Sequence, residues 1–370
     1  MEVRNNYNEC LTNLACSIRK YFGLDYKHNT LKDIDDILEK EQPKNVVLML
    51  FDGMGSRILN RTLEEDSFFA RNMDREITTV FPATTTAATT SIRTGLNPVE
   101  HGWLGWNVYI KPIDKIITLF FNVQKGTEEI DEDFLKVKNK LVTTSISQEI
   151  NAKGEYSAVE LYPFPVDKTV TYNGLDDMLR MVKEETEKDG KRFIYAYDDE
   201  PDHSMHEIGP DHWKIKELIE ERSQKVEKLC EELKDTLVII VADHGHKKVD
   251  HVYLNDYPEL TNMLERNTSI EQRAVSFKVK EDYKEKFVKV FNELFGKDYD
   301  LYTKEEVIAS GLFGDGEPNE LFEPALGDFI AISHTAMDLV YDGDDVLYSH
   351  HAGYTDDEIY VPLIKVLKSK

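Results

Sequence analysis

The sequence predicts an α/β fold: a three-layer α/β/α sandwich with a mixed, mostly parallel central sheet and a smaller inserted α+β subdomain. Three observations predict it. From residue 44 onward, short apolar runs alternate with segments of helical periodicity, which is typical of a parallel sheet covered by helices on both faces. Residues 254–332 break this rhythm, and it resumes after them. The chain contains no internal repeat and no flexible Gly/Ser linker.

The first 43 residues predict two helices, over residues 9–21 and 31–38, and we expect residues 1–43 to form an N-terminal helical segment. Residues 44–253 and 333–370 are expected to form the main domain. Its predicted strands cover residues 45–51, 77–81, 156–161, 192–197 and 236–242, its predicted helices cover residues 84–94, 143–152, 175–188 and 215–233, and a further apolar stretch covers residues 359–366.

Residues 254–332 are expected to form the inserted subdomain and to pack beside the site as a lid. They contain predicted strands over residues 274–279 and 328–332, a predicted helix over residues 283–295 and a Gly-rich turn at residues 311–316. This mixture does not continue the strand–helix alternation of the main domain.

Charge and composition limit the partners. The net charge is −25, from 70 acidic and 45 basic residues. Such a surface repels nucleic-acid backbones and anionic lipids, so we expect no nucleic-acid polymer and no membrane partner. A small phosphorylated substrate is compatible, because bound cations reverse the field inside one cleft. We expect a cytoplasmic location: no run of 18 apolar residues exists, the N-terminus has no signal-peptide pattern, and the three cysteines are sparse.

Polar side chains that bind metals follow four predicted strands. They are Asp52, the threonine run at residues 84–86, Asp202 with His206, and Asp243 with His244. Each alone has an ordinary explanation, such as a turn, a helix N-cap or a solvated loop. Because ligands in open α/β sheets collect at the carboxyl ends of strands, their joint placement predicts a shared site.

The chemistry of this set fits two divalent cations. Mixed carboxylate and imidazole ligands suit zinc, with manganese or iron as alternatives. In two-metal hydrolases the cations clamp the attacking and leaving oxygens of an in-line displacement. A metal also lowers the pKa of a threonine hydroxyl, which is otherwise far too high for attack at neutral pH. A helix start favours a phosphoryl group through its unpaired N–H groups.

The sequence resembles a known family at these motifs. Phe81-Pro-Ala-Thr-Thr-Thr, Thr94-Gly-Leu-Asn-Pro-Val-Glu-His-Gly, Glu200-Pro-Asp-His-Ser-Met-His and Ala242-Asp-His-Gly are similar to segments of the alkaline phosphatase superfamily, in its type I phosphodiesterase/nucleotide pyrophosphatase branch. The resemblance implies one metal held by Asp52, Thr85, Asp243 and His244, and a second held by Asp202, His206 and His351. It also implies that Asn107 hydrogen-bonds a phosphate oxygen, although the loop before it is one residue longer than in that branch.

Two assignments stay open at this point. Thr85 is chosen as the nucleophile because it lies nine residues before Thr94, and Thr84 remains the alternative. His351 stands beside His350, which is the alternative ligand. The predicted function is hydrolysis of phosphodiester or phosphoanhydride bonds of a small substrate, such as a nucleotide, through a phosphothreonine intermediate. The alternatives are a phosphomonoesterase of the same superfamily and, from a different class, a non-catalytic metal-containing binding protein.

Overall fold

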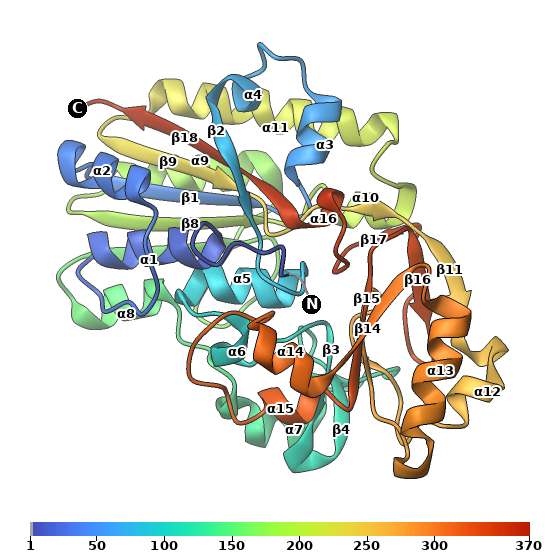
Figure 1. The fold of residues 1–370 in the computed structure, drawn as a ribbon. Coiled ribbons are helices and arrows are strands. Elements are labelled where there is room, and N and C mark those ends of the chain that lie inside the picture. The colour runs from blue at the N-terminus through green and yellow to red at the C-terminus, as the bar shows by residue number, and fades with distance from the viewer. Residues whose placement is uncertain (1–2) are drawn as a thin grey trace.

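The computed structural model describes residues 3–370 and contains two seven-stranded sheets (Figure 1). The main sheet has the order β2-β18-β9-β1-β8-β6-β7. Its strands are β1 (Asn45–Phe51), β2 (Met73–Thr78), β6 (Ser157–Tyr162), β7 (Val170–Thr171), β8 (Arg192–Asp198), β9 (Thr236–Val241) and β18 (Tyr360–Lys368). β1 runs parallel to β8 and β9, whereas β18 runs antiparallel to β9 and β2. The predicted mixed, mostly parallel sheet is therefore confirmed.

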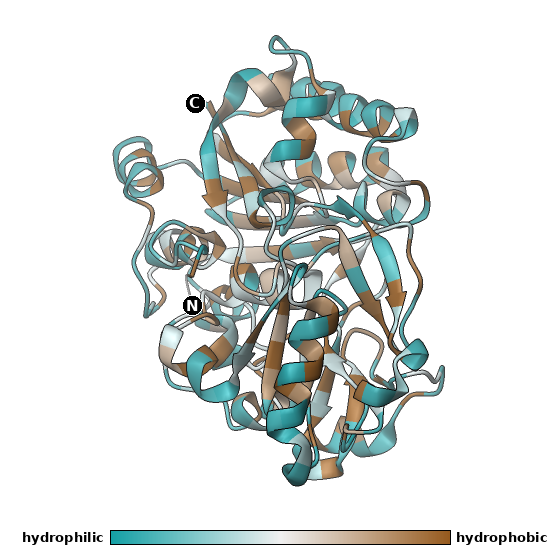
Figure 2. Cartoon of the chain, turned by 45° about the vertical axis from the view of Figure 1, so that its right-hand side comes forward, coloured by the Kyte–Doolittle hydropathy of each residue, from teal (hydrophilic) through white to brown (hydrophobic). Residues whose placement is uncertain are grey.

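Helices cover both faces of the main sheet (Figure 1). One face carries α1 (Leu11–Tyr21), α5 (Thr85–Thr94) and α8 (Ile146–Lys153), and the other carries α3 (Ser56–Thr62), α9 (Gly174–Glu187) and α11 (Trp213–Glu232). Every residue of β1 is buried, as expected for a central strand between two helical layers. Figure 2 shows the same division, with apolar strands inside and polar outer faces on the helices.

The second sheet has the order β14-β15-β13-β12-β3-β4-β5. Its strands are β3 (Asn107–Ile110), β4 (Lys115–Thr118), β5 (Val123–Gln124), β12 (Ser269–Ile270), β13 (Ala274–Phe277), β14 (Tyr299–Thr303) and β15 (Phe329–Ser333). One face packs on α13 (Lys284–Phe295), and the other on α14 (Lys304–Ser310) and α15 (Phe322–Ala325). Three of its strands thus come from residues 107–124, outside the predicted insertion, and the boundaries 254–332 stay a prediction.

Two short strand pairs and several short helices complete the described fold. β10 (Lys247–Lys248) pairs with β17 (Ser349–His350), and β11 (Asp250–Tyr253) pairs with β16 (Met337–Val340). The remaining helices are α2 (Lys32–Glu41), α4 (Phe68–Asn72), α6 (Pro98–His101), α7 (Glu132–Val137), α10 (Asp202–Ile208), α12 (Pro258–Thr261) and α16 (Asp356–Ile359). Short 3-10 turns lie at Lys111–Ile113, Lys138–Lys140, Leu254–Asp256 and Glu281–Tyr283. Within residues 3–370, no helix combines the length and apolar character that crossing a bilayer requires.

The structure corrects the second predicted strand. We expected it over residues 77–81, and it is β2, at Met73–Thr78. The apolar residues after Thr78 leave the sheet, because Pro82 has no N–H to donate and the chain turns there toward α5. Residues 74–76 of β2 are charged and are exposed or only partly buried, so its sequence does not show the apolar run of a buried strand. Residues 1 and 2 of the predicted N-terminal segment lie outside the described residues.

Candidate metal centre and active site

The predicted site residues come from separate elements and meet at one end of the main sheet. Asp52 follows β1, Thr85 is the first residue of α5, Asp202 and His206 lie on α10 after β8, Asp243 and His244 follow β9, and His351 follows β17. All of them except Thr85 belong, together with His246, to two neighbouring candidate metal-binding groups, within each of which the ligand atoms lie within 4.8 Å of one another.

The first, the carboxylate-rich group, contains Asp52, Asp243 and His244, all buried. His244 Nε2 lies 3.3 Å from Asp52 Oδ1 and 3.4 Å from Asp243 Oδ2. The same nitrogen lies 3.2 Å from Thr85 Oγ1. The hydroxyl predicted as nucleophile therefore lies beside this group.

The electrostatics of the carboxylate-rich group are unbalanced among the described side chains. Asp52 Oδ1 and Asp243 Oδ2 are buried and have no hydrogen-bond partner in residues 3–370. Burial and the charge of Asp243 raise the pKa of Asp52 well above its ordinary value, and burial and the charge of Asp202 raise the pKa of Asp243. Two buried carboxylates with unpartnered oxygens fit a divalent cation, which would neutralise both.

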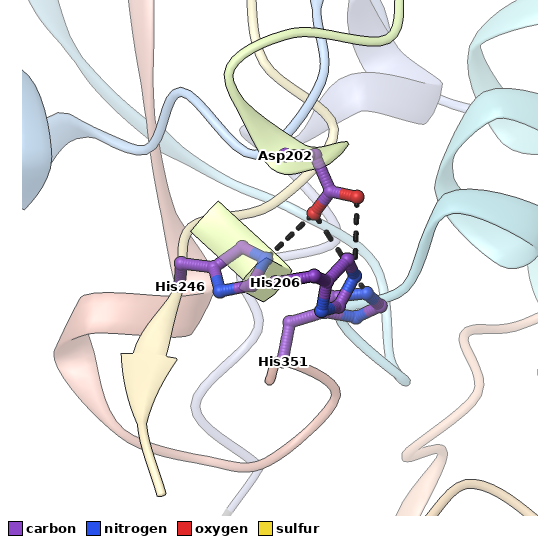
Figure 3. Close-up of side chains that lie close together, drawn as sticks. All are labelled: Asp202, His206, His246 and His351. Carbon is purple, nitrogen blue, oxygen red and sulfur yellow. Dashed lines mark hydrogen bonds and ion pairs between the residues drawn. The ribbon is translucent and has the colours of Figure 1, made fainter. Parts of the chain in front are cut away.

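The second, the histidine-rich group, contains Asp202, His206, His246 and His351 (Figure 3). His246 Nε2 lies 2.7 Å from Asp202 Oδ1, and His206 Nε2 lies 3.2 Å from Asp202 Oδ2. His351 Nε2 lies 3.9 Å from Asp202 Oδ1. Burial raises the pKa of Asp202, but the opposing effect of His206 and His246 is larger and holds that pKa well below its ordinary value.

Backbone carbonyl groups orient three of the imidazoles. The Nδ1 of His206 donates to the Ser349 carbonyl oxygen at 2.8 Å. The Nδ1 of His351 donates to the Ala83 carbonyl oxygen at 3.1 Å, and that of His244 to the Gly245 carbonyl oxygen at 3.0 Å. A carbonyl oxygen only accepts, so each Nδ1 carries a hydrogen, and Nε2 is the nitrogen that faces the carboxylates. A carbonyl oxygen bonded to one ring nitrogen in this way fixes the ring so that the other nitrogen can bind a metal. The residues present therefore fit two cations.

The two groups touch through stacked rings. The rings of His244 and His351 lie 3.8 Å apart between centroids, at an interplanar angle of 24°. A pair of cations bound by the two groups would accordingly be close neighbours, as two-metal chemistry requires.

The structure separates the two pairs of alternatives. Thr84 donates its hydroxyl to Glu271 Oε1 at 2.6 Å, whereas Thr85 faces the carboxylate-rich group, so the geometry favours Thr85. His350 lies outside both groups, and its Nδ1 bonds to the carbonyl of His351 at 2.9 Å, so the geometry favours His351. The roles of these residues in binding and catalysis stay predictions.

Asn107 begins β3 and pairs with Ile270 of β12. Its Oδ1 accepts a hydrogen bond from Thr118 Oγ1 at 2.7 Å, and its amide nitrogen has no hydrogen-bond partner among residues 3–370. The preceding residue, Trp106, donates its backbone N–H to the Glu271 oxygen that also accepts from Thr84. The start of β3 is thereby tied to the start of α5, and the amide of Asn107 stays available to an acceptor such as a phosphate oxygen.

Two residues of the site were not assigned from the sequence. For His246 the sequence does hold a signal: it lies two residues after His244, and alternate residues of an extended chain share a face. Glu271 belongs to no motif and gave no signal. Both contact predicted site residues directly or through Thr84.

Comparison with known proteins agrees with this geometry. Residues 46–354 match the sequence model of the type I phosphodiesterase / nucleotide pyrophosphatase family. Among solved structures, murine ectonucleotide pyrophosphatase / phosphodiesterase 5 is similar, with 18% identity, 88% of each chain covered and a TM-score of 0.63. Its inactive threonine-to-alanine variant in complex with AMP gives 18% identity, coverage of 88% and 87%, and a TM-score of 0.62. Human ectonucleotide pyrophosphatase / phosphodiesterase 5 is also similar, with 17% identity, coverage of 88% of this chain and 87% of that chain, and a TM-score of 0.61.

A search of curated protein sequences finds no match. The structural matches lie below 20% identity and show the fold, while the family match covers most of the chain. The resemblance seen in the motifs is thereby confirmed. The chain belongs to the type I phosphodiesterase / nucleotide pyrophosphatase family and is a metal-dependent hydrolase of that class.

Proposed function

We propose that the protein hydrolyses phosphodiester or phosphoanhydride bonds of a small, nucleotide-like substrate, with Thr85 as the nucleophile and a phosphothreonine intermediate. The observation that carries the proposal is the position of Thr85 Oγ1, 3.2 Å from His244 Nε2 and beside two buried carboxylates. The murine relative whose threonine-to-alanine variant is inactive supports a threonine in this role.

In this proposal Asp52, Thr85, Asp243 and His244 hold one divalent cation, and Asp202, His206 and His351 hold the other. Zinc suits the mixture of imidazole and carboxylate, and manganese or iron are alternatives. Bound cations supply positive charge that favours deprotonation of the attacking hydroxyl and neutralises the leaving oxygen. His246 lies close enough to Asp202 to orient it or to share its cation.

The chain's own residues position the reaction. Thr85 opens α5, so the unpaired N–H groups of the first helical turn face a phosphoryl group held there. The free amide of Asn107 donates to a second phosphoryl oxygen. The bond from Thr85 Oγ1 to phosphorus forms as the bond to the leaving oxygen breaks, and water then hydrolyses the phosphothreonine and restores the hydroxyl.

Aromatic side chains beside Asn107 support a nucleotide substrate. Trp106 stacks on Phe120 at 5.4 Å between ring centroids, and the neighbouring Phe121 is 56% exposed. Exposed aromatic surface next to the predicted phosphate site suits a base or another flat leaving group. AMP in the complex of the murine relative is consistent with this substrate class.

Arg93 and Lys247 are the cationic residues next to the site motifs that a monoesterase could use to bind the extra phosphate charge, and both are already paired. Arg93 bonds to Glu160 at 2.7 Å, and Lys247 bonds to Asp357 at 2.8 Å. A monoester dianion gains nothing from cations whose charge is already neutralised. This pairing favours the diesterase over the monoesterase.

The test is an assay of the purified, metal-loaded protein on a nitrophenyl ester of a nucleotide and on nitrophenyl phosphate. We expect chelator-sensitive release of nitrophenol, with the diester cleaved faster. Faster cleavage of the monoester would support the phosphatase alternative. Absence of turnover on both substrates, with two metal equivalents bound, would favour the non-catalytic binding protein.

A further inference from the structure

The turn between β12 and β13 places buried polar residues against the candidate active site. Glu271 lies in this turn and is 7% exposed. The residue before it, Ile270, has φ of +74°, a left-handed conformation that is costly for a β-branched side chain. Such strain persists where the surroundings fix the backbone, and here Ile270 is held by its pairing with Asn107.

One oxygen of Glu271 joins two segments that are distant in the sequence. Its Oε1 accepts a hydrogen bond from Thr84 Oγ1 at 2.6 Å and from the Trp106 backbone N–H at 2.7 Å. Thr84 directly precedes the predicted nucleophile, and Trp106 directly precedes the predicted phosphate-binding residue. Glu271 therefore contacts the neighbours of both groups that the proposed reaction aligns on phosphorus.

The same turn also supports the segment that carries His351. Arg273 is fully buried and bonds to Glu358 at 2.7 Å, and Glu358 accepts the backbone N–H of Gly353 at 2.8 Å. A Cβ on Gly353 would lie 2.7 Å from Arg273 Nη2, so the two segments are in close contact. The turn thus contacts the site from two sides.

Burying a carboxyl group costs desolvation free energy that an apolar side chain at the same position would not cost. Burial raises the pKa of Glu271 to about 7, and the side chain has no ion-pair partner among the described residues that would offset its desolvation. The hydrogen bonds to Thr84 and Trp106 are what it contributes in return. These hydrogen bonds hold the start of α5 and the start of β3 in a fixed relative position.

We propose that Glu271 is a positioning residue, whose carboxylate oxygen sets Thr85 relative to Asn107 by holding Thr84 and Trp106. The proposal rests on the proposed function of this site. It requires an acceptor oxygen at this place and does not require a charge. Since a displacement of about 1 Å in a reacting group can lower a rate about a hundredfold, loss of this acceptor is expected to be costly.

Glu271→Leu removes the acceptor at similar volume, and Glu271→Gln keeps an acceptor oxygen without the charge. In the assay on the nitrophenyl nucleotide ester, we expect the leucine variant to lose about 30- to 100-fold in kcat. The glutamine variant should stay within about threefold of the parent. Glu265→Gln, at an exposed position of the same segment, is the matched control and should equal the parent.

Thr84→Val tests the same contact from its other side and leaves Glu271 and the packing in place. Its kcat should fall about tenfold, and the double variant with Glu271→Leu should lose no more than Glu271→Leu alone, because both changes break one interaction. Should Glu271→Leu fail to fold, Thr84→Val and Glu271→Gln still decide the question. Additive losses in the double variant, equal losses in leucine and glutamine, or no loss in either would each overturn the proposal.

A second measurement separates this proposal from the proposed function. Titration calorimetry with inorganic phosphate on the zinc-loaded proteins needs no turnover. We expect about tenfold weaker phosphate binding in Glu271→Leu and unchanged binding in Glu271→Gln, with equal zinc content in both. A parent that binds zinc and phosphate but hydrolyses neither substrate would sink the proposed function, and equal phosphate affinity in all variants would then sink the role of Glu271.

Discussion

The carboxylate-rich group and the histidine-rich group lie side by side, yet their charges are balanced differently. In the first, Asp52 and Asp243 each present a buried oxygen with no hydrogen-bond partner in residues 3–370. In the second, Asp202 bonds to His206 and His246, so protein groups already compensate its charge. The first group therefore contains a repulsion that a cation would relieve, whereas in the second group histidines offset the charge of the aspartate.

Removing the hydroxyl beside the carboxylate-rich group is expected to reduce activity more than any other change to the site. Thr85→Ala should lower kcat at least about a thousandfold, because it removes the attacking oxygen. The remaining ligands should keep two metal equivalents, measured by elemental analysis of the same sample. Retained turnover would move the nucleophile to Thr84 or contradict the mechanism.

Metal content gives the next effect, and it probes the two groups separately. Asp243→Asn and His206→Gln should each reduce bound metal from two equivalents to one after dialysis, since each removes one ligand from a different group. Elemental analysis and titration with a chromophoric chelator measure this. Loss of both metals in either variant would mean that the groups bind as one unit, through the stacked His244 and His351.

Stability of the metal-free protein should separate the groups by sign. Asp202→Asn should lower the free energy of unfolding by about 1–3 kcal/mol, because it weakens the bonds to His206 and His246. Asp52→Asn should leave it unchanged or raise it, because it relieves repulsion with Asp243. Urea unfolding in the presence of chelator measures both. A loss in Asp52→Asn as large as in Asp202→Asn would contradict the comparison.

Asp52 and Asp202 should also give the free energy of unfolding of the metal-free protein opposite dependences on pH. The pKa of Asp52 is raised in the folded protein, so its ionisation reduces stability as pH rises above about 4, its range in the unfolded chain. The pKa of Asp202 is lowered, so its contribution is present above about pH 4 and lost as pH falls below it. Asp52→Asn should flatten the decline toward neutral pH, and Asp202→Asn the decline toward acid.

The smallest effect concerns a histidine of the same motif that belongs to neither group. His203 is 68% exposed in its side chain. His203→Gln should keep both metals, and its melting temperature and kcat should match the parent within error. A loss of metal in this variant would show that membership of the motif, rather than of a group, decides ligation.

Much of this site could be predicted because its residues follow buried strands. Asp52, Asp243 and His244 come directly after apolar runs, and the carboxyl ends of parallel strands meet at one edge. The same reasoning placed the threonine run at residues 84–86, Asp202 and His206, whereas the resemblance to the family selected Thr85 within the run. For His351 the motif carried the prediction, because the strand before it is only two residues long.

The second sheet could not be predicted in the same way. β5 and β12 contain two residues each, too few for a periodic pattern, and β12 pairs with β3, far earlier in the chain. Pairing over such a distance depends on the tertiary fold and leaves no local signal. Glu271 was missed for this reason, since only that pairing brings it to Thr84.

The position of β18 determines when the main sheet can be completed during synthesis of the chain. This strand, formed by residues 360–368, lies between β9 and β2 and is hydrogen-bonded to both. Until a ribosome has released those residues, two neighbouring edges present unpaired N–H and C=O groups, which invite pairing with other chains. A nascent chain that stalls before Tyr360 thus exposes both edges to pairing with other chains.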